Sequence, residues 1–482
     1  MNPQIVKLFG LILVLYALLF GFTSYWSIFD AEGLEQNTAN KRPLLEEQRI
    51  ERGQILAADG SVIARSVPQG KGGDRTFVRR YPKGGLYGNP VGYSFVDRGR
   101  AGFELSHNDE LVGNKTEFLS IIDELRGQVQ AGSDVQSALD PEGQQTALDA
   151  LDGQNGSVVA IVPSTGEVRT MVSVPTYDPN DVPASFAQLN QEEDAPLFNR
   201  ATQAGYPPGS TMKVVTATAA LDSGEFDTDS TQVADSGVEI SGVPLANSGG
   251  QDFGEIDMKT ALTNSVNTYW AQIAEDLGTD TMYKYMDRFG FNEQPPLDYP
   301  SFQLATSGEF AGGKLLEPGS GQIDVGRMAI GQDKLNVTPL QMAMVVSAVA
   351  NGGELMEPRL WSKVIDTDGR ETDLDPERMS RVMSGDTAET LTGMMTDVVN
   401  EGTGGAAQLA EIQVAGKTGT AEIDVANNIN QAWFIGFAPA DDPKIAVAAT
   451  VERTSGQGGT VAAPIAQQVL EVLLANSDSD GG

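Results

Sequence analysis

The sequence contains no cysteine and a single histidine, His107, and these shortages exclude several kinds of active site. Without cysteine there can be no disulfide, no cysteine nucleophile and no zinc site built from cysteine and histidine. A Ser-His-Asp triad would have to use His107, which lies in a charged stretch and is predicted to be a surface residue. Basic residues are also scarce, 32 against 66 acidic ones, which gives a net charge of −34. Such a surface repels phosphate backbones and argues against nucleic acid as a partner.

The first thirty residues predict a membrane anchor. Leu8 to Phe29 is an uncharged, largely apolar run about as long as a bilayer is thick, with Lys7 before it and Asp30 after it. By the positive-inside rule, residues 1–7 form a cytoplasmic tail, and the chain that follows the membrane-spanning helix lies on the outer side of the cell membrane. A cleaved signal peptide is the alternative. The run is longer than the apolar region of such a peptide, however, and no A-x-A site follows it.

The length of 482 residues allows two or three domains, and the composition is that of a folded protein. Residues 30–152 predict a stalk and a small loop-rich module, with a hairpin around Asp59-Gly60. A short helix over 140–151, with Pro141 in its first turn, leads to the main domain, residues 153–476. In that domain, residues 156–162, 167–174, 433–438 and 444–451 predict antiparallel strands, 461–475 a closing helix, and 477–482 a disordered acidic tail beyond it.

Ser210 and Lys213 form the first motif that carries chemistry. Two prolines and a glycine block regular structure up to Gly209, and a helical run then ends before Gly224. Ser210 is therefore predicted at the mouth of a helix, with Lys213 one turn further on the same face. A hydroxyl there faces free N–H groups, and an amine of lowered pKa one turn away can take its proton. The alternative is an N-cap serine followed by a solvated lysine.

Ser265 and Asn267 form a second candidate motif, at the junction of helices predicted over 257–264 and 268–277. A loop that presents a hydroxyl and an amide can relay a proton and hold a substrate amide. The alternative is a turn with an N-cap.

Lys417-Thr418-Gly419-Thr420 lies on a strand predicted over 414–421, whose glycines allow close approach of another group. A strand of this kind beside a helix N-terminus offers a cation, hydroxyls and a backbone N–H to a carboxylate-ended substrate. A solvated lysine on an edge strand is the alternative.

Taken together, S-x-x-K, S-x-N and K-T-G in this order are the motif set of penicillin-binding proteins and related β-lactamases, here with Ser-Val-Asn as the middle motif. From Gly156 onward the chain resembles the transpeptidase domain of penicillin-binding proteins. The anchor and the preceding module resemble class B members, and the acidic, Gly/Ala-rich composition resembles actinobacterial ones. Further matching stretches are Arg52-Gly53, Gly102-Phe103-Glu104, Asp178-Pro179-Asn180, Asn199-Arg200-Ala201, 329–332, 431–437 and Thr338-Pro339-Leu340-Gln341, the last also predicted as a helix capping box.

The resemblance implies a role for each catalytic residue. Ser210 attacks the carbonyl between the terminal D-alanines of a peptidoglycan stem peptide, with Lys213 as its base. Ser265 relays a proton to the leaving D-alanine, Asn267 holds the substrate amide, and Lys417 helps to keep Lys213 neutral.

The resemblance also implies how substrate is bound. Thr418, Gly419 and Thr420 form the substrate-binding strand, with the two threonine hydroxyls on the terminal carboxylate. The backbone N–H groups of Ser210 and Thr420 form the oxyanion hole. No metal or organic cofactor is implied, and β-lactams are expected to acylate Ser210. A membrane-embedded glycan polymerase is the expected partner.

The implied fold is α+β: one N-terminal transmembrane helix, a pedestal module, and a five-stranded antiparallel sheet flanked by helices with an all-helical lobe. Rival functions are a β-lactam sensor, or a hydrolase such as a D,D-carboxypeptidase or β-lactamase. The predicted anchor, the pedestal and the absence of a recognisable E-x-x-L-N deacylation motif argue against a hydrolase of either kind. The lifetime of the acyl-enzyme would separate these functions.

Overall fold

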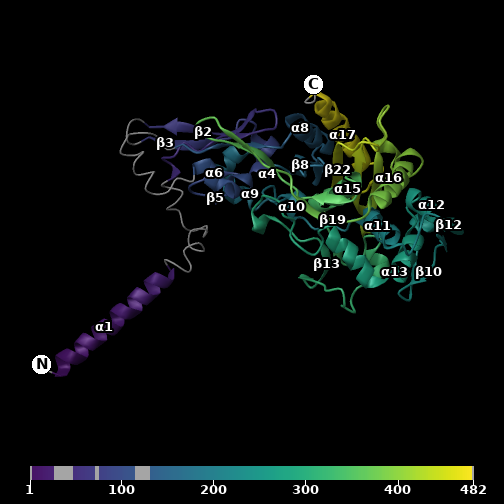
Figure 1. Cartoon of the computed structure of the whole chain (residues 1–482), viewed down its shortest axis with the longest axis horizontal. Coiled ribbons are helices and arrows are strands. Elements are labelled where there is room, and N and C mark those ends of the chain that lie inside the picture. The colour runs from purple at the N-terminus through teal and green to yellow at the C-terminus, as the bar shows by residue number, and fades with distance from the viewer. Residues whose placement is uncertain (1–2, 27–46, 71–74, 114–130, 480–482) are drawn as a thin grey trace.

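The computed structural model describes residues 3–26, 47–70, 75–113 and 131–479. Its first element, α1 (Pro3–Ser24), is the one described helix that is long and apolar enough to cross a membrane, and none of its residues is buried against the rest of the chain. It begins five residues before the predicted span of 8–29, and residues 27–29 lie outside the described ranges. Figure 1 shows the path of the chain from α1 to the C-terminus.

The module that follows is built on a six-stranded sheet, in the order β18-β17-β6-β1-β2-β3. The predicted hairpin at Asp59-Gly60 is confirmed, because β1 and β2 pair antiparallel on either side of it. Strands β17 and β18 come from the predicted main domain, and β17 pairs with β6. The two predicted units therefore share one sheet. The strands are β1 (Ile55–Leu56), β2 (Val62–Gln69), β3 (Thr76–Arg80), β6 (Asp134–Ser137), β17 (Trp361–Ile365) and β18 (Glu371–Asp373).

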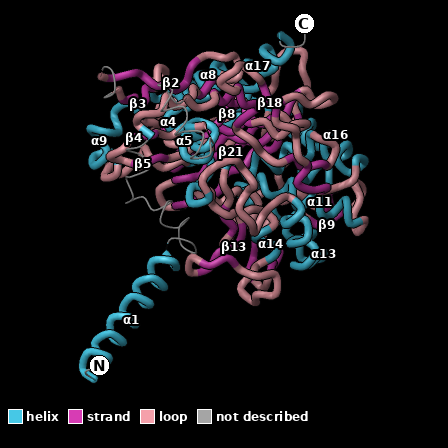
Figure 2. Tube along the Cα trace, turned by 60° about the vertical axis from the view of Figure 1, so that its left-hand side comes forward, coloured by secondary structure: helices cyan, strands magenta, loops and turns pink. Residues whose placement is uncertain are grey.

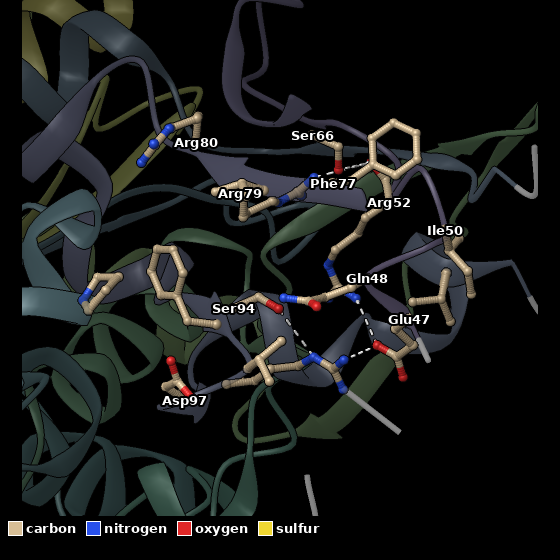
Figure 3. A pocket seen from close by; sticks show the side chains of 16 residues that line it. Glu47, Gln48, Ile50, Arg52, Ser66, Phe77, Arg79, Arg80, Ser94 and Asp97 are labelled. Atoms are coloured by element: carbon tan, nitrogen blue, oxygen red, sulfur yellow. Dashed lines mark hydrogen bonds and ion pairs between the residues drawn. The ribbon is translucent and has the colours of Figure 1, made fainter. Parts of the chain in front are cut away.

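A buried ion cluster joins Arg52-Gly53 and Gly102-Phe103-Glu104, two of the stretches on which the predicted resemblance rests. Arg52 Nε donates to Glu104 Oε2 at 2.8 Å, and Arg79 Nε donates to Glu104 Oε1 at 2.6 Å. The two guanidinium groups offset the cost of burying the carboxylate. Figure 3 shows the adjoining pocket of about 320 Å³, which Arg52 and Arg79 line together with Glu47 and Arg100. This pocket shares no residue with the Ser210 site described below.

The prediction of a surface histidine is wrong. His107 is 4% exposed, between α5 (Phe103–Ser106) and α6 (Asn108–Val112). Its ring packs against Phe103 and Trp361, and Nε2 lies 3.1 Å from Asp298 Oδ2. The aromatic partner Trp361 arrives from β17, more than two hundred residues further along the chain, so the charged sequence around His107 gives no sign of this burial.

The main domain contains the predicted five-stranded antiparallel sheet, in the order β20-β21-β22-β7-β8. Its two predicted hairpins are confirmed, since β7 pairs with β8 and β21 with β22. The described residues of the main domain fall into two hydrophobic core clusters. Helices α8 (Pro141–Leu151) and α17 (Ala462–Ser479) pack on one face of the sheet in one cluster, and α15 (Pro339–Ala350) contacts the sheet and belongs to the second cluster. The strands are β7 (Gly156–Ile161), β8 (Val168–Val174), β20 (Ala415–Asp424), β21 (Ile429–Ala438) and β22 (Ile445–Thr454).

Two local predictions need correction. Helix α17 continues to Ser479, so residues 477–479 are helical, while 480–482 of the predicted tail lie outside the described ranges. At α15, Thr338 caps as predicted by accepting from Gln341 N at 3.1 Å. The Gln341 side chain does not accept the return bond, because the Thr338 N–H donates to Ser307 Oγ at 3.0 Å instead. The predicted capping box is therefore only half formed.

The helical lobe, which contains α11, α12 and α13, lies at the end of the molecule opposite β3 and α9 (Val182–Leu189) (Figures 1 and 2). The predicted helices on both sides of Ser265 are present, and the second continues through a break at Gly278, where φ is +76°. The main helices are α11 (Lys213–Ser223), α12 (Met258–Thr263), α13 (Asn267–Arg288) and α16 (Gly385–Asn400). The shorter elements are η3 (Gly84–Tyr87), α4 (Gly88–Val91), β4 (Ser94–Phe95), β5 (Gly99–Arg100), η4 (Pro179–Asp181), α9 (Val182–Leu189), α10 (Arg200–Gln203), η5 (Gly209–Met212), β9 (Thr231–Val233), β10 (Val238–Ile240), β11 (Val243–Leu245), η6 (Ser248–Gly250), β12 (Glu255–Asp257), η7 (Ser301–Gln303), β13 (Gly308–Ala311), β14 (Lys314–Leu315), α14 (Val325–Met328), β15 (Leu335–Asn336), β16 (Glu354–Met356), β19 (Arg378–Arg381) and η8 (Gly405–Ala407).

Candidate active site

Ser210 lies on a 3₁₀ turn, η5, that leads directly into α11. The predicted helix N-terminus is thus a single 3₁₀ turn, and Lys213 is the first residue of the α-helix that follows it. Gly209 opens the turn with φ +54°, and its N–H donates to Gly331 O at 3.0 Å. A Cβ on Gly331 would stand 2.0 Å from Gly209 O. The close contact of these two glycines fixes the backbone immediately before Ser210.

Lys213 is fully buried and its amine lies among acceptors of the second motif. Nζ donates to Ser265 O and to Asn267 Oδ1, both at 2.7 Å, and lies 3.3 Å from Ser265 Oγ. A neutral amine has two N–H groups and one lone pair. The two short bonds can use both N–H groups, which leaves the lone pair free to accept a proton from a hydroxyl.

Ser265 is held in a strained conformation between α12 and α13. Its φ is +57°, in the left-handed region that costs a residue with a side chain about 1–2 kcal/mol. Its N–H donates to Leu262 O, and the next N–H, of Val266, donates to Ala261 O. The turn presents both the carbonyl and the hydroxyl of Ser265 to Lys213, which is the kind of arrangement for which backbone strain persists at functional sites.

Lys417 reaches the same hydroxyl from strand β20. Its Nζ donates to Ser265 Oγ at 2.8 Å and to Thr418 O at 3.1 Å, and the residue is fully buried. The three motifs, which are separated by up to about two hundred residues, therefore meet at Ser265 Oγ.

The electrostatics of this cluster favour an uncharged Lys213. Burial lowers the pKa of Lys213 well below its usual range, and the charge of Lys417 lowers it further. Burial lowers the pKa of Lys417 to about 7. Across the described part of the chain, neither amine forms an ion pair with a carboxylate. An unpaired buried cation is costly, so the site favours loss of a proton from at least one of the two amines.

The β20 strand approaches the nucleophile turn closely at Gly419. A Cβ on Gly419 would lie 2.7 Å from Pro208 O, and one on Gly209 would lie 3.1 Å from the carbonyl carbon of Thr420. Glycine at position 419 is thus required for the contact that places the backbone of Thr420 beside Ser210. The prediction that the glycines of this strand allow close approach agrees with these contacts.

The structure also brings in residues that sequence reasoning missed. Thr418 Oγ1 lies 2.6 Å from the hydroxyl of Thr403, in the loop after α16, and Thr420 Oγ1 accepts from Gly458 N at 3.0 Å. Thr403 lies in a Gly-Thr-Gly-Gly stretch, whose clustered glycines mark a tight loop, but nothing in the pattern says which strand this loop meets.

A second missed group supports the turn from the other side. Trp433 Nε1 donates to Pro207 O at 3.0 Å, and its ring packs edge-on against Tyr206. The Tyr206 hydroxyl donates to Glu452, which also accepts from Arg200 Nε at 2.7 Å. These contacts hold the segment before Ser210 against the sheet.

Comparisons with known proteins agree with this geometry. Residues 156–471 match the penicillin binding protein transpeptidase domain, and residues 52–135 match the penicillin binding protein A dimerisation domain. Peptidoglycan D,D-transpeptidase PbpA of Mycolicibacterium smegmatis is 34% identical, over 98% of this chain and 99% of that protein. The corresponding protein of Mycobacterium tuberculosis is 32% identical over 98% of this chain and 99% of its own length.

Solved structures give the same result. Penicillin-binding protein A from M. tuberculosis, as a ceftriaxone acyl-enzyme complex, matches with a TM-score of 0.80 at 30% identity, over 89% of this chain and 100% of that one. The D,D-transpeptidase domain of a peptidoglycan glycosyltransferase from Eggerthella lenta matches with a TM-score of 0.77 at 33% identity, over 89% and 99%. The predicted resemblance and fold class are confirmed, and the mycobacterial relatives agree with the predicted likeness to actinobacterial members. The chain therefore belongs to the class B penicillin-binding proteins.

Proposed function

We propose that the protein is a peptidoglycan D,D-transpeptidase that works through an acyl-Ser210 intermediate and is inhibited by β-lactams. The observation that carries this proposal is the burial of two lysine amines against one serine hydroxyl, with neither amine paired to a carboxylate of the residues that the structure describes. The mycobacterial relatives bear the name of this activity, and one of them forms an acyl-enzyme with ceftriaxone.

In the acylation step, Ser210 Oγ attacks the carbonyl carbon between the two terminal D-alanines, and its proton passes to the neutral amine of Lys213. The tetrahedral intermediate collapses, the peptide C–N bond breaks, Ser265 gives its hydroxyl proton to the departing nitrogen, and Lys213 passes the proton that it took from Ser210 to Ser265 Oγ. Lys417 donates to Ser265 Oγ, and Lys213 Nζ lies 3.3 Å from the same oxygen, so the Ser265 hydroxyl proton is free to point at the departing nitrogen. Free D-alanine leaves, and the acyl group stays on Ser210 as an ester.

Substrate is held by the strand and the loop that frame Ser210. The backbone N–H groups of Ser210 and Thr420 form the oxyanion hole, a role supported by the close approach of Gly209 to Thr420. Asn267 holds the substrate amide, and the hydroxyls of Thr418 and Thr420 bind the terminal carboxylate. The amine of a second stem peptide then attacks the ester carbonyl and forms the crosslinking amide bond. The bond from the carbonyl carbon to Ser210 Oγ breaks, and the amine proton passes through Ser265 and Lys213 to Ser210 Oγ.

Helix α1 would anchor the enzyme in the cell membrane. Its 22 residues measure about 33 Å along the axis, enough for a hydrocarbon core of about 30 Å. The N-terminus is cytoplasmic and the catalytic domain extracytoplasmic, where stem peptides are found. Added protease should digest the catalytic domain of intact spheroplasts, and protection from it would refute this orientation. We also propose a membrane-embedded glycan polymerase as partner through the anchor and pedestal, which a pull-down that recovers no polymerase would contradict.

The decisive experiment is intact-protein mass spectrometry after treatment with benzylpenicillin. The protein should gain the mass of one whole antibiotic, and peptide mapping should place it on Ser210. The Ser210→Ala variant should gain nothing, whereas Ser223→Ala, a serine at the far end of α11, should be labelled normally. A labelled Ser210→Ala protein would refute the proposal.

The second half of the reaction needs its own measurement. With a D-Ala-D-Ala donor peptide and an amine acceptor, a transpeptidase releases D-alanine and forms a crosslinked product. Release of D-alanine with only the hydrolysed peptide would indicate a carboxypeptidase instead. Rapid turnover of the penicillin adduct would indicate a β-lactamase, and a stable adduct without any peptide turnover would indicate a sensor.

A further inference from the structure

Thr403 lies beside the hydroxyl proposed to bind the substrate carboxylate. Its Oγ1 is 2.6 Å from Thr418 Oγ1, and either oxygen can be the donor. Thr418 is 6% exposed, whereas Thr403 is exposed. The two hydroxyls therefore form a short chain that begins in solvent and ends at the edge strand of the site.

The direction of this chain decides what Thr418 can bind. A hydroxyl has one proton to donate and can accept as well. If Thr418 donated to Thr403, it would have no proton left for an anion. If Thr403 donates to Thr418, the Thr418 proton is free to point at the substrate. A nearby carboxylate favours the second arrangement, since hydrogen bonds in a chain polarise one another toward the charge.

Thr420 shows the same arrangement with a fixed direction. Its Oγ1 accepts from the backbone N–H of Gly458 at 3.0 Å, and an N–H can only donate. The Thr420 proton is thus free to be donated elsewhere. Each proposed carboxylate-binding hydroxyl therefore has a hydrogen-bond partner on the neighbouring loops, Gly458 for Thr420 and Thr403 for Thr418.

The backbone of Thr403 is positioned by contacts that do not involve its hydroxyl. A Cβ on Gly459 would stand 2.4 Å from Thr403 O and 3.6 Å from Thr418 Cγ2. One on the preceding Gly402 would stand 2.3 Å from Thr263 O, two residues before Ser265. The loop is therefore packed on the site through glycines, and a change of the Thr403 side chain should leave its path intact.

We infer that Thr403 is a positioning residue that donates to Thr418 and so directs the Thr418 hydroxyl proton at the carboxylate of the substrate or of a β-lactam. This inference rests on the proposed function. It makes Thr403 a determinant of specificity for ligands that end in a free carboxylate, and it gives the residue no part in proton transfer at Ser210.

The test compares Thr403→Val, which keeps the shape without the hydroxyl, with Thr403→Ser, which keeps the hydroxyl. The second-order rate of Ser210 acylation is measured with benzylpenicillin and with its methyl ester. Thr403→Val should slow acylation by benzylpenicillin about tenfold, the effect of one hydrogen bond, through weaker binding and not through a slower step at saturation. The ester should react at an unchanged rate with both variants, and Thr403→Ser should behave as the wild type with both compounds.

A double-mutant cycle gives a second readout. In a Thr418→Val background, Thr403→Val should have no further effect on benzylpenicillin, because the proton that it directs is gone. Equal losses for the acid and the ester, additive losses in the cycle, or no loss at all would overturn the inference. Absence of any Ser210 adduct in the wild type would instead overturn the proposed function, and the inference with it.

Discussion

The most informative perturbation is removal of the positive charge of Lys417. Ser265 Oγ lies 3.3 Å from Lys213 Nζ and 2.8 Å from Lys417 Nζ, so the two nitrogens are at most about 6 Å apart. At an effective dielectric constant of about 20, two like charges at that distance repel by about 3 kcal/mol.

The sign of the effect on the reaction rate follows from the proposed role of Lys213 as a neutral base. A neighbouring positive charge disfavours protonated Lys213 and lowers its pKa. Burial lowers the pKa of Lys417 to about 7, so Lys417 carries its charge mainly below that pH. The Lys417→Gln variant removes the charge but keeps an N–H for Ser265. The pKa of Lys213 should therefore rise.

The assay is the second-order rate of penicillin acylation across about pH 5 to pH 9. The rising limb, which reports the neutral fraction of Lys213, should move to higher pH in Lys417→Gln. Thr418→Val, an uncharged change beside it, should lower the rate without moving the limb. A limb that stays in place or moves to lower pH in Lys417→Gln would refute the electrostatic reasoning, even if the maximal rate falls.

Three other predictions concern the pedestal and the nucleophile turn. Glu104→Gln leaves Arg52 and Arg79 buried without their carboxylate and should lower the free energy of unfolding, measured by urea titration, by about 3–5 kcal/mol. A loss below about 1 kcal/mol would contradict the interpretation as a buried ion pair. Burial alone would raise the pKa of Glu104, but Arg79 and Arg52 hold this pKa at about 2. The contribution of Glu104 to stability should therefore be complete above its ordinary pKa of 4.5 and be lost as the pH falls toward 2. Acid unfolding of the wild type and of Glu104→Gln measures this difference. Gly331→Ala puts a Cβ 2.0 Å from Gly209 O and should slow acylation about 100-fold by displacing the turn, and an unchanged rate would show that the turn does not need this contact.

Local features of the fold follow from the sequence because their causes are local. Asp140 and Asp257 begin helices, as the patterns predict, since each side chain accepts a hydrogen bond from an N–H three residues on. The hairpin at Asp59-Gly60 and the strands of the main sheet depend on turn chemistry and alternation along a few residues. The family could likewise be predicted, because its motifs are short and occur in a fixed order.

Burial and long-range pairing could not be predicted in this way. His107 is flanked by charged residues in sequence and yet is buried, because β17 brings Trp361 against it. Half of the capping box is missing because Ser307 Oγ, about thirty residues earlier in the chain, accepts the bond from the Thr338 N–H. In each case the deciding partner comes from a distant segment whose position no local pattern contains.

The sequence by itself determined which chemical groups are available: two serine hydroxyls and two lysine amines spread over three motifs, with no thiol and a single imidazole. Only the tertiary structure decided that both amines meet at Ser265 Oγ, where no carboxylate of the described residues pairs with either amine, and this burial lowers the pKa of side chains that are otherwise cations. The physical reason is that a pKa depends on desolvation and on neighbouring charge, and both are supplied by the packing of α11, the Ser265 turn and β20.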